Sequence, residues 1–168
     1  MKDSFVIEPL GAHDRAAFTC GVASLDRYLR ELASQDVKRL VAGCFVAVET
    51  AANSIAGYYT LAAASVRADE VPAELIKRLP RYPVLPAALV GRLAVDQRFY
   101  GKGLGSALLA DAALRVLKGD LKAFALMVEA KDDNAVGFYR HQGFQPFVGR
   151  PRSLFLPLAT VKKANARQ

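Results

Sequence analysis

A glycine-rich turn at residues 98–106, which reads RFYGKGLGS, is the segment of this sequence best suited to chemistry. It follows an apolar stretch that ends at Val95 and precedes a helical pattern. Glycine lets backbone N–H groups approach an anion closely, and the start of a helix adds unpaired N–H donors and a positive dipole. The turn therefore predicts a pyrophosphate site, with candidate residues Arg98, Gly101, Lys102, Gly103, Leu104, Gly105 and Ser106.

The order of residues in this turn narrows the choice of ligand. A P-loop requires glycine, four residues and then Gly-Lys-Ser/Thr, which the sequence around Lys102 does not match. A dinucleotide fingerprint would need glycine in place of Ser106, although Glu129, at the end of the next expected strand, suits a ribose contact. A tight connection between strand and helix, with Lys102 facing water, explains the same residues without a ligand. The turn by itself leaves these alternatives open.

The elements on either side of the turn form a β-α-β pattern. Residues 87–95 are a nearly continuous apolar run, which is typical of a central strand, and Gly91 within it indicates a bulge or a close approach of another chain segment. Residues 104–118 carry apolar side chains on two helical faces, which predicts a well-buried helix. Residues 124–130 are the next expected strand. Such a unit feeds one sheet.

The remaining segments complete an α/β (α+β) fold around one mixed sheet. Ser24 can cap a helix whose apolar face reaches Leu32, and Gly143 can end another helix. We expect a single domain over residues 1–160 and a frayed basic tail over 161–168. Further strands are expected at 5–7, 43–49, 55–66 and 154–158, and further helices at 73–79 and 132–141.

Two motifs, in this order, resemble those of the GNAT superfamily of acetyltransferases. The first is Arg98-x-x-Gly101-x-Gly103 after Leu93-Ala94-Val95, and the second is Asn134-Ala135-x-x-Phe138-Tyr139-x-x-x-Gly143-Phe144, with Asn and Ala adjacent here. The resemblance implies a mixed central sheet with a splayed strand pair and helices on both faces. It also implies that the chain is an N-acetyltransferase with acetyl-CoA as its cofactor.

Shorter segments resemble one subgroup of this superfamily, the toxins that acetylate aminoacyl-tRNA. These segments are FTCG at 18–21, LDRYL at 25–29, QD at 35–36, GYYTL at 57–61, LPRYP at 79–83 and GRLAVD at 91–96. In the subgroup the toxins acetylate the amino acid on charged tRNA, and ribbon-helix-helix antitoxins neutralise them. The resemblance therefore implies an aminoacyl-tRNA substrate and an antitoxin partner. It leaves open whether the chain forms a homodimer.

The resemblance also implies roles for individual residues. The backbone of Leu93, Ala94 and Val95 would pair with the pantetheine arm of the cofactor, and the N–H of Val95 would stabilise the oxyanion. Asn134 would bind the same arm. Tyr139 would protonate the departing thiolate, because a phenol with a pKa of about 10 is protonated at neutral pH. Simpler readings are that Leu93, Val95 and Tyr139 only pack in the core and that Asn134 caps a helix.

No residue stands out as a general base. The histidines are His13 and His141, and Asp96 follows the predicted strand where a turn or capping residue would also stand. An α-amino group has a pKa of about 8, which a neighbouring ester should lower, whereas a lysine has a pKa of about 10.4. The missing base therefore favours an aminoacyl ester over a protein lysine as acceptor.

The charge of the chain favours an anionic partner. The formal net charge is +7 and the isoelectric point is near 9.6, which suits RNA, although a basic surface can also serve only solubility. A basic cleft would repel polycationic acceptors such as polyamines. Candidate contacts to tRNA are Arg78, Arg81, Arg92, Arg140 and Arg150.

Three hypotheses on function follow from these observations. They are a tRNA-directed acetyltransferase toxin, a GNAT enzyme acting on protein or small-molecule amines, and a nucleotide-binding regulatory module without chemistry. Cys20 and Cys44 are too isolated for a metal site or a disulfide framework. With neither a signal peptide nor a membrane-spanning run in the sequence, we expect a cytoplasmic protein.

Overall fold

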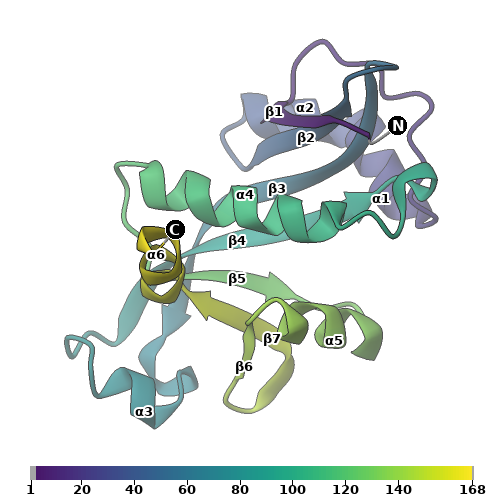
Figure 1. The fold of residues 1–168 in the computed structure, drawn as a ribbon. Coiled ribbons are helices and arrows are strands. Elements are labelled where there is room, and N and C mark those ends of the chain that lie inside the picture. The colour runs from purple at the N-terminus through teal and green to yellow at the C-terminus, as the bar shows by residue number, and fades with distance from the viewer. Residues whose placement is uncertain (1–2, 168) are drawn as a thin grey trace. The chain divides into compact units, whose positions relative to one another are not determined.

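The computed structural model describes residues 3–167. Its seven strands form a mixed sheet with the order β1-β2-β3-β4-β5-β7-β6 (Figure 1). The chain divides into two compact units, one of Met1–Ala62 with Gly91–Ala112 and the other of Ala63–Val90 with Ala113–Gln168. The strands are β1 (Phe5–Pro9), β2 (Gly43–Glu49), β3 (Ser54–Arg67), β4 (Val84–Val95), β5 (Ala125–Glu129), β6 (Gln145–Phe147) and β7 (Arg150–Pro157), and the helices are α1 (Ala23–Arg27), α2 (Ala33–Lys38), α3 (Ala73–Ile76), α4 (Leu104–Lys118), α5 (Asp133–His141) and α6 (Leu158–Ala166).

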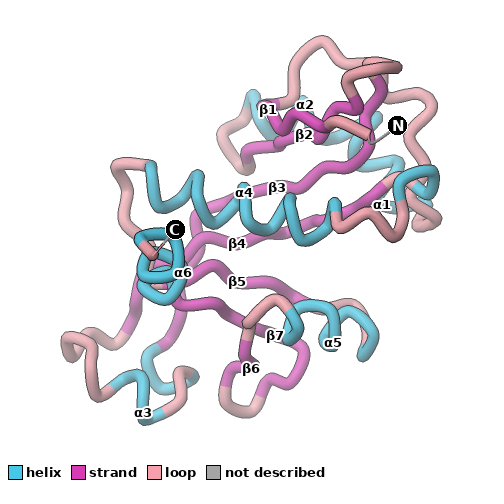
Figure 2. Tube along the Cα trace, in the orientation of Figure 1, coloured by secondary structure: helices cyan, strands magenta, loops and turns pink. Residues whose placement is uncertain are grey.

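The first unit is built on an antiparallel meander. Strand β1 pairs with β2, and β2 pairs with β3. Figure 2 shows the short helix α2 close to β2. A π-helical segment, Tyr28–Leu32, joins α1 to α2 and turns the fully buried Leu29 toward Val46 and Tyr58 in one apolar core. Burial of these side chains, more than local propensity, holds such short helices in place.

The predicted cap of the first helix was wrong. Helix α1 begins at Ala23, and its cap position is Val22, which forms no side-chain hydrogen bond. The polar side chain used instead is Asp26, which is buried and accepts a hydrogen bond of 2.8 Å from the Cys20 N–H. The buried Asp26 carboxylate thus accepts the hydrogen bond of a backbone N–H just before the helix. Ser24 is exposed at the surface and does not occupy the cap position.

The second unit surrounds β5. Strand β4 pairs with β5 in parallel from Ala87↔Ala125 to Val90↔Val128, and β5 pairs with β7 antiparallel. Strand β6, which the sequence pattern did not predict, extends the antiparallel part beyond β7. The rings of Phe147 and Phe155 stack with their centroids 4.7 Å apart in the core of this unit.

The C-terminal segment is helical where we expected a frayed tail. Helix α6 runs to Ala166, so residues from Val161 continue a regular element. Its first residue, Leu158, is 2% exposed and donates its N–H to Phe124 O at 2.9 Å, which anchors the helix to the unit. Gln168 lies outside the described residues, as do Met1 and Lys2. A single domain over residues 1–160 stays a prediction.

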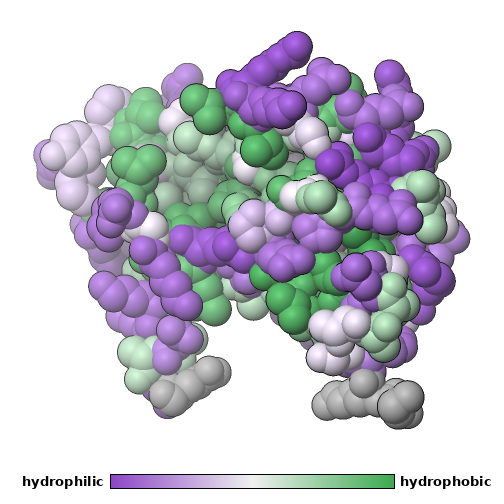
Figure 3. Space-filling view, turned by 90° about the horizontal axis from the view of Figure 1, so that it is seen from above, coloured by the Kyte–Doolittle hydropathy of each residue, from purple (hydrophilic) through white to green (hydrophobic). Residues whose placement is uncertain are grey.

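The surface and the core have the character that the composition indicates. Hydrophilic side chains cover much of the face drawn in Figure 3, with hydrophobic ones between them. Cys20 and Cys44 are both buried and free, and burial raises the pKa of the Cys20 thiol to about 11 and that of Cys44 to about 12. Across residues 3–167, no helix has the length and apolar character that crossing a membrane requires.

A glycine in β3 lets the strand and helix around the predicted turn pack closely. A Cβ at Gly57 would lie 2.9 Å from Ala94 O and 3.0 Å from Leu108 Cδ1. A Cβ at Gly91, where we expected a bulge or a close approach, would lie 3.2 Å from Thr60 Oγ1, so the close approach is confirmed. Gly57 therefore sets the distance between β3, the end of β4 and α4.

Replacing this glycine should destabilise the protein. We expect Gly57→Ala to lower the free energy of unfolding by about 2 kcal/mol, because the methyl group would push against a backbone carbonyl. Gly137→Ala is the matched control, since an added Cβ there meets nothing within 4 Å and alanine is the better helix former. Urea denaturation of both variants checks this. Equal stability of the two variants would contradict the packing argument.

Candidate functional site

The glycine-rich turn has the backbone of an anion site. Gly101 and Gly103 both have a φ of +76°, and a Cβ at either position would meet nothing within 4 Å. Glycine is thus required there for its conformation and not for want of space. Helix α4 begins at Leu104, and its first i to i−4 hydrogen bond runs from Ala107 N–H to Gly103 O at 3.1 Å. The N–H groups that precede Ala107 in the helix have no partner within it, which suits a phosphate.

The residues of this turn differ in how far they are exposed to solvent and in their ionic contacts. Leu104 is 4% exposed and anchors the helix in the core, whereas Gly105 and Ser106 are half-buried in its first turn. Lys102 is exposed and forms an ion pair with Asp3. To contact a phosphate bound at the turn, the Lys102 ammonium group would have to leave the Asp3 carboxylate.

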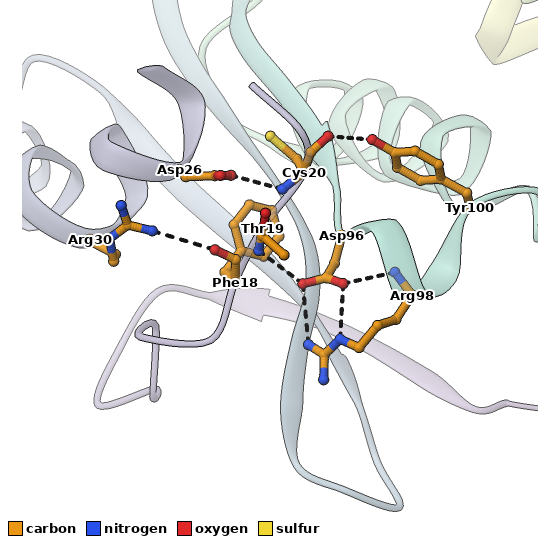
Figure 4. Close-up of polar contacts among 8 residues, drawn as sticks. All are labelled: Phe18, Thr19, Cys20, Asp26, Arg30, Asp96, Arg98 and Tyr100. Atoms are coloured by element: carbon orange, nitrogen blue, oxygen red, sulfur yellow. Dashed lines mark hydrogen bonds and ion pairs between the residues drawn. The ribbon is translucent and has the colours of Figure 1, made fainter. Parts of the chain in front are cut away.

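A buried carboxylate holds the start of the turn in place (Figure 4). Asp96 follows β4 directly and is 0% exposed. Its carboxylate accepts hydrogen bonds from the Arg98 N–H at 2.9 Å, from Arg98 Nε at 2.9 Å and from Arg98 Nη2 at 3.2 Å. It also accepts one from the Thr19 N–H at 3.1 Å. One side chain thereby joins the turn to a segment 77 residues away in the chain.

That distant segment, Phe18–Cys20, is tied to the turn and to the π-helical segment Tyr28–Leu32 at several further points. Gln97 N–H donates to Thr19 O at 2.9 Å, and the Tyr100 hydroxyl donates to Cys20 O. Arg30 Nη1 donates to Phe18 O at 3.4 Å. In Figure 4, Thr19 and Arg98 meet the Asp96 carboxylate, while Arg30 and Tyr100 contact the backbone oxygens of Phe18 and Cys20. Local sequence patterns carry no signal for such pairs, and we did not predict them.

The surroundings of Asp96 make it a poor general base. Burial works to raise the pKa of this carboxyl group, but the hydrogen bonds from Arg98 and Thr19 prevail and hold the pKa below its usual value. The carboxylate also raises the pKa of Arg98. Asp96 is therefore a capping residue. His13 forms a hydrogen bond of 2.8 Å with Glu8, and His141 is exposed at the end of α5.

The last residues of β4 extend beyond the part of the strand that pairs with β5. The register of β4 with β5 ends at Val90↔Val128, whereas β4 itself continues to Val95. Asp96 N–H donates to Ala56 O on β3 at 2.8 Å. Because successive N–H groups along a strand point to opposite edges, the N–H of Val95 points away from β3. Ala94 is buried in the core, while Leu93 and Val95 lie half-buried on the other face.

Tyr139 lies in the second unit, on α5, and is 9% exposed. Its ring makes edge-on contacts with Phe138 and Phe144, with centroids 5.3 Å and 5.6 Å away. Burial raises the pKa of the Tyr139 hydroxyl to about 12. Within residues 3–167 this hydroxyl has no hydrogen-bond partner. The side chain thus packs in the core and also keeps a neutral phenol with a proton to donate.

Asn134 does not cap the helix. The cap of α5 is Asp132, whose carboxylate accepts a hydrogen bond of 2.8 Å from the Ala135 N–H. Asn134 is exposed in the first helical turn. The capping alternative for Asn134 is therefore wrong, and its amide is accessible to a ligand.

The arginines predicted to contact tRNA fall into two groups. Arg92 lies over the Tyr28 ring, 3.6 Å from its centroid, and Arg150 pairs with Glu70 at 2.8 Å and with Glu129 at 3.0 Å. These two are engaged within the protein. The others are exposed, namely Arg78, Arg81 and Arg140. The glycine-rich turn, Val95 and Arg92 belong to the first unit, and all other predicted site residues after Ala112, with Arg78 and Arg81, belong to the second.

Removing the Asp96 carboxylate should destabilise the protein. We expect Asp96→Asn to cost about 3 kcal/mol in free energy of unfolding, because it leaves buried donors facing an amide. Asp69→Asn is the control, since its ion pair with Arg67 is exposed to solvent and should contribute little to stability. Chemical denaturation at neutral pH measures both. Similar losses in the two variants would show that the Asp96 contacts contribute little.

The effect of Asp96 should also depend on pH. Because its pKa is lowered on folding, its contribution is present above the unfolded-state pKa of about 3.9 and is lost as the pH falls through the folded-state pKa. We expect the stability difference between the natural protein and Asp96→Asn to be constant from about pH 7 to 5 and to shrink below about pH 4. A difference that grows on acidification would contradict the assigned direction.

Comparison with known proteins identifies the family. Residues 41–146 match the acetyltransferase (GNAT) domain family. A tRNA-acetylating toxin of Mycobacterium tuberculosis is 36% identical over 147 residues, which cover 86% of this chain and 86% of that protein.

Two solved structures resemble the whole fold. AtaT complexed with acetyl-methionyl-tRNAfMet is 27% identical, with a TM-score of 0.88 over 96% of this chain and 99% of that chain. A mutant of the toxin AtaT bound to the C-terminus of the antitoxin AtaR is 25% identical, with a TM-score of 0.77 over 95% of this chain and 97% of that chain. The glycine-rich turn after β4 and the Asn134–Phe144 segment are the two motifs by which the sequence resembles this superfamily. The chain belongs to the GNAT acetyltransferase family.

Proposed function

We propose that this protein transfers the acetyl group of acetyl-CoA to the α-amine of an aminoacyl-tRNA and so acts as a toxin that blocks translation. The observation that carries the proposal is the 36% identity to a tRNA-acetylating toxin over 86% of both chains. As a GNAT N-acetyltransferase the protein uses acetyl-CoA. We propose a role in this reaction for each group of residues described above.

The glycine-rich turn fits the pyrophosphate of the cofactor. Its two positive-φ glycines leave the backbone open to a close approach, and the N-terminus of α4 supplies unpaired N–H donors. In this proposal Arg98, Lys102 and the turn Gly101–Ser106 hold the phosphates. The backbone from Leu93 to Val95 and the amide of Asn134 hold the pantetheine arm.

Acetyl-CoA supplies an activated thioester when bound. The Val95 N–H, which points away from β3, is the proposed donor to the carbonyl oxygen as negative charge develops there. A backbone donor needs no movement at the moment of reaction. The ion pair and hydrogen bonds of Asp96 keep the residues on either side of this N–H in a fixed conformation.

Tyr139 is the proposed general acid. As the new C–N bond forms and the C–S bond breaks, its hydroxyl would donate a proton to the departing sulfur, and the amine would lose its own proton to water. With a pKa of about 12 the phenol stays protonated throughout the physiological range. A buried ring held by Phe138 and Phe144 loses little freedom on reaction.

The lack of an evident general base among the described site residues favours an aminoacyl ester as the acceptor. Asp96 is engaged in ion pairing and His13 with Glu8, so neither is available to deprotonate an amine. An aminoacyl ester, whose amine has a pKa below about 8, reacts without such help. The net charge of +7 also suits an RNA substrate.

We further propose a protein partner. Since AtaT has been solved with the C-terminus of the antitoxin AtaR, we expect this chain to bind an antitoxin too, of the ribbon-helix-helix type that the toxin subgroup uses. A homodimer and a cytoplasmic location, where charged tRNA is found, are parts of the same proposal.

The acid assignment predicts the effect of Tyr139→Phe. Removing the hydroxyl should lower the rate of acetyl transfer to charged tRNA by about a hundredfold or more, because general acid catalysis is lost. Binding of acetyl-CoA and the melting temperature should change little. Incubation of the purified protein with labelled acetyl-CoA and a pool of aminoacylated tRNA measures the transfer.

Two outcomes would contradict parts of the proposal. Full activity of Tyr139→Phe would remove this residue from the chemistry. Binding of acetyl-CoA without label on any tRNA would refute the tRNA acceptor and would leave protein or small-molecule amines as substrates.

A further inference from the structure

The loop between α3 and β4 presents an aromatic ring to solvent. Tyr82 is 62% exposed. Of the large hydrophobic side chains exposed in residues 3–167, the other aromatic one is Tyr100, and its hydroxyl is held by Cys20 O. Tyr82 has no catalytic role in the proposed reaction.

The loop holds this ring in a stiff backbone. Pro80 and Pro83 flank it in the chain, and proline fixes its own φ. Tyr82 N–H donates to Pro80 O at 2.9 Å. Pro83 O accepts a hydrogen bond of 3.0 Å from the Ala68 N–H, which ties the loop to the segment after β3. A ring presented in this way loses little conformational entropy when it binds a ligand.

Cations that form no ion pair with a described carboxylate lie close to Tyr82 in the chain, and two of them line the same surface hollow. Lys77, Arg78 and Arg81 are exposed, and none of them lies in an ion pair with a described carboxylate. By contrast, neighbouring arginines of the same unit are neutralised, as in Arg67–Asp69 and Arg150–Glu70. Lys77, Arg81 and Tyr82 line a surface hollow whose apolar wall includes Ile76 and Leu79.

We propose that this loop binds single-stranded RNA, with Tyr82 stacked on an unpaired base and Lys77, Arg78 and Arg81 on the flanking phosphates. An unpaired base offers a free face for stacking, whereas bases inside a duplex are already stacked on their neighbours, so a single strand is the ligand that suits this ring. Uncompensated cations beside the ring favour a polyanion over an apolar protein surface. The inference rests on the proposed function, in which that strand is the unpaired 3′ end of a charged tRNA.

Binding of a short RNA by the full-length protein tests the stacking. The probe is a fluorescent 12-nucleotide single strand ending in CCA, and a duplex of the same length is the comparison. We expect Tyr82→Leu to weaken binding of the single strand about tenfold, and Tyr82→Phe, which keeps the ring, to bind it like the natural protein. Binding of the duplex should be equal in all three. Melting temperatures of the variants exclude unfolding as the cause.

Salt dependence tests the cations separately. Arg81→Gln should reduce the slope of log affinity against log salt concentration by about 0.7, the value for one phosphate contact on a single strand. Lys162→Gln removes the same charge from the exposed surface of α6 and should leave the slope unchanged. Tyr82→Leu should also keep the slope, because stacking releases no counterions.

The results separate this inference from the proposed function. If Tyr82→Leu binds the single strand as the natural protein does, or loses single strand and duplex equally, the stacking site is refuted. Should Tyr82→Leu instead abolish self-association or antitoxin binding with no effect on RNA, the loop is a protein interface and the inference fails. Loss of single-strand binding in Tyr82→Leu, in a protein that acetylates no tRNA, would keep the site and refute the proposed reaction.

Discussion

The buried carboxylate of Asp96 is the interaction on which the rest of the candidate site depends. A charge that is 0% exposed is tolerated only when every lone pair has a donor, and Arg98 and Thr19 supply those donors. The same contacts fix the end of β4, the entry to the glycine-rich turn and the Phe18–Cys20 segment. Because the buried carboxylate must keep these hydrogen-bond donors, the backbone next to Val95 is held in one conformation.

The reaction proposed for this site uses two uncharged hydrogen donors. One group is a backbone N–H whose direction follows from strand pairing, and the other is a phenol kept neutral by burial. Neither needs a charged neighbour. Arg92 and Arg150 are engaged in contacts within the protein, whereas the cations near Tyr82 form no ion pair with a described carboxylate and are the ones proposed to contact RNA.

Periodicity predicted the elements that are long and uniformly patterned. The bounds of β2 and α4 agree with the expected ones, because apolar spacing and glycine at or beside their ends mark them clearly. Strand β6 is three residues long and includes Pro146, so it has no pattern of its own. Helix α6 is mostly polar and depends on the burial of Leu158, and the start of α1 depends on Asp26. The residues of the turn were recognisable from sequence, but the contacts of Asp96 were not, since they join positions 77 residues apart.

The open space around Gly101 and Gly103 has a consequence for divergence within the family. A turn that binds its ligand mainly through backbone groups makes few demands on the chemistry of the surrounding side chains, provided that the positive φ angles are kept. Side chains elsewhere on the surface can then change without loss of the proposed cofactor turn. The fold shared with AtaT, at a TM-score of 0.88 and 27% identity, shows that most of the sequence can differ while the backbone stays similar.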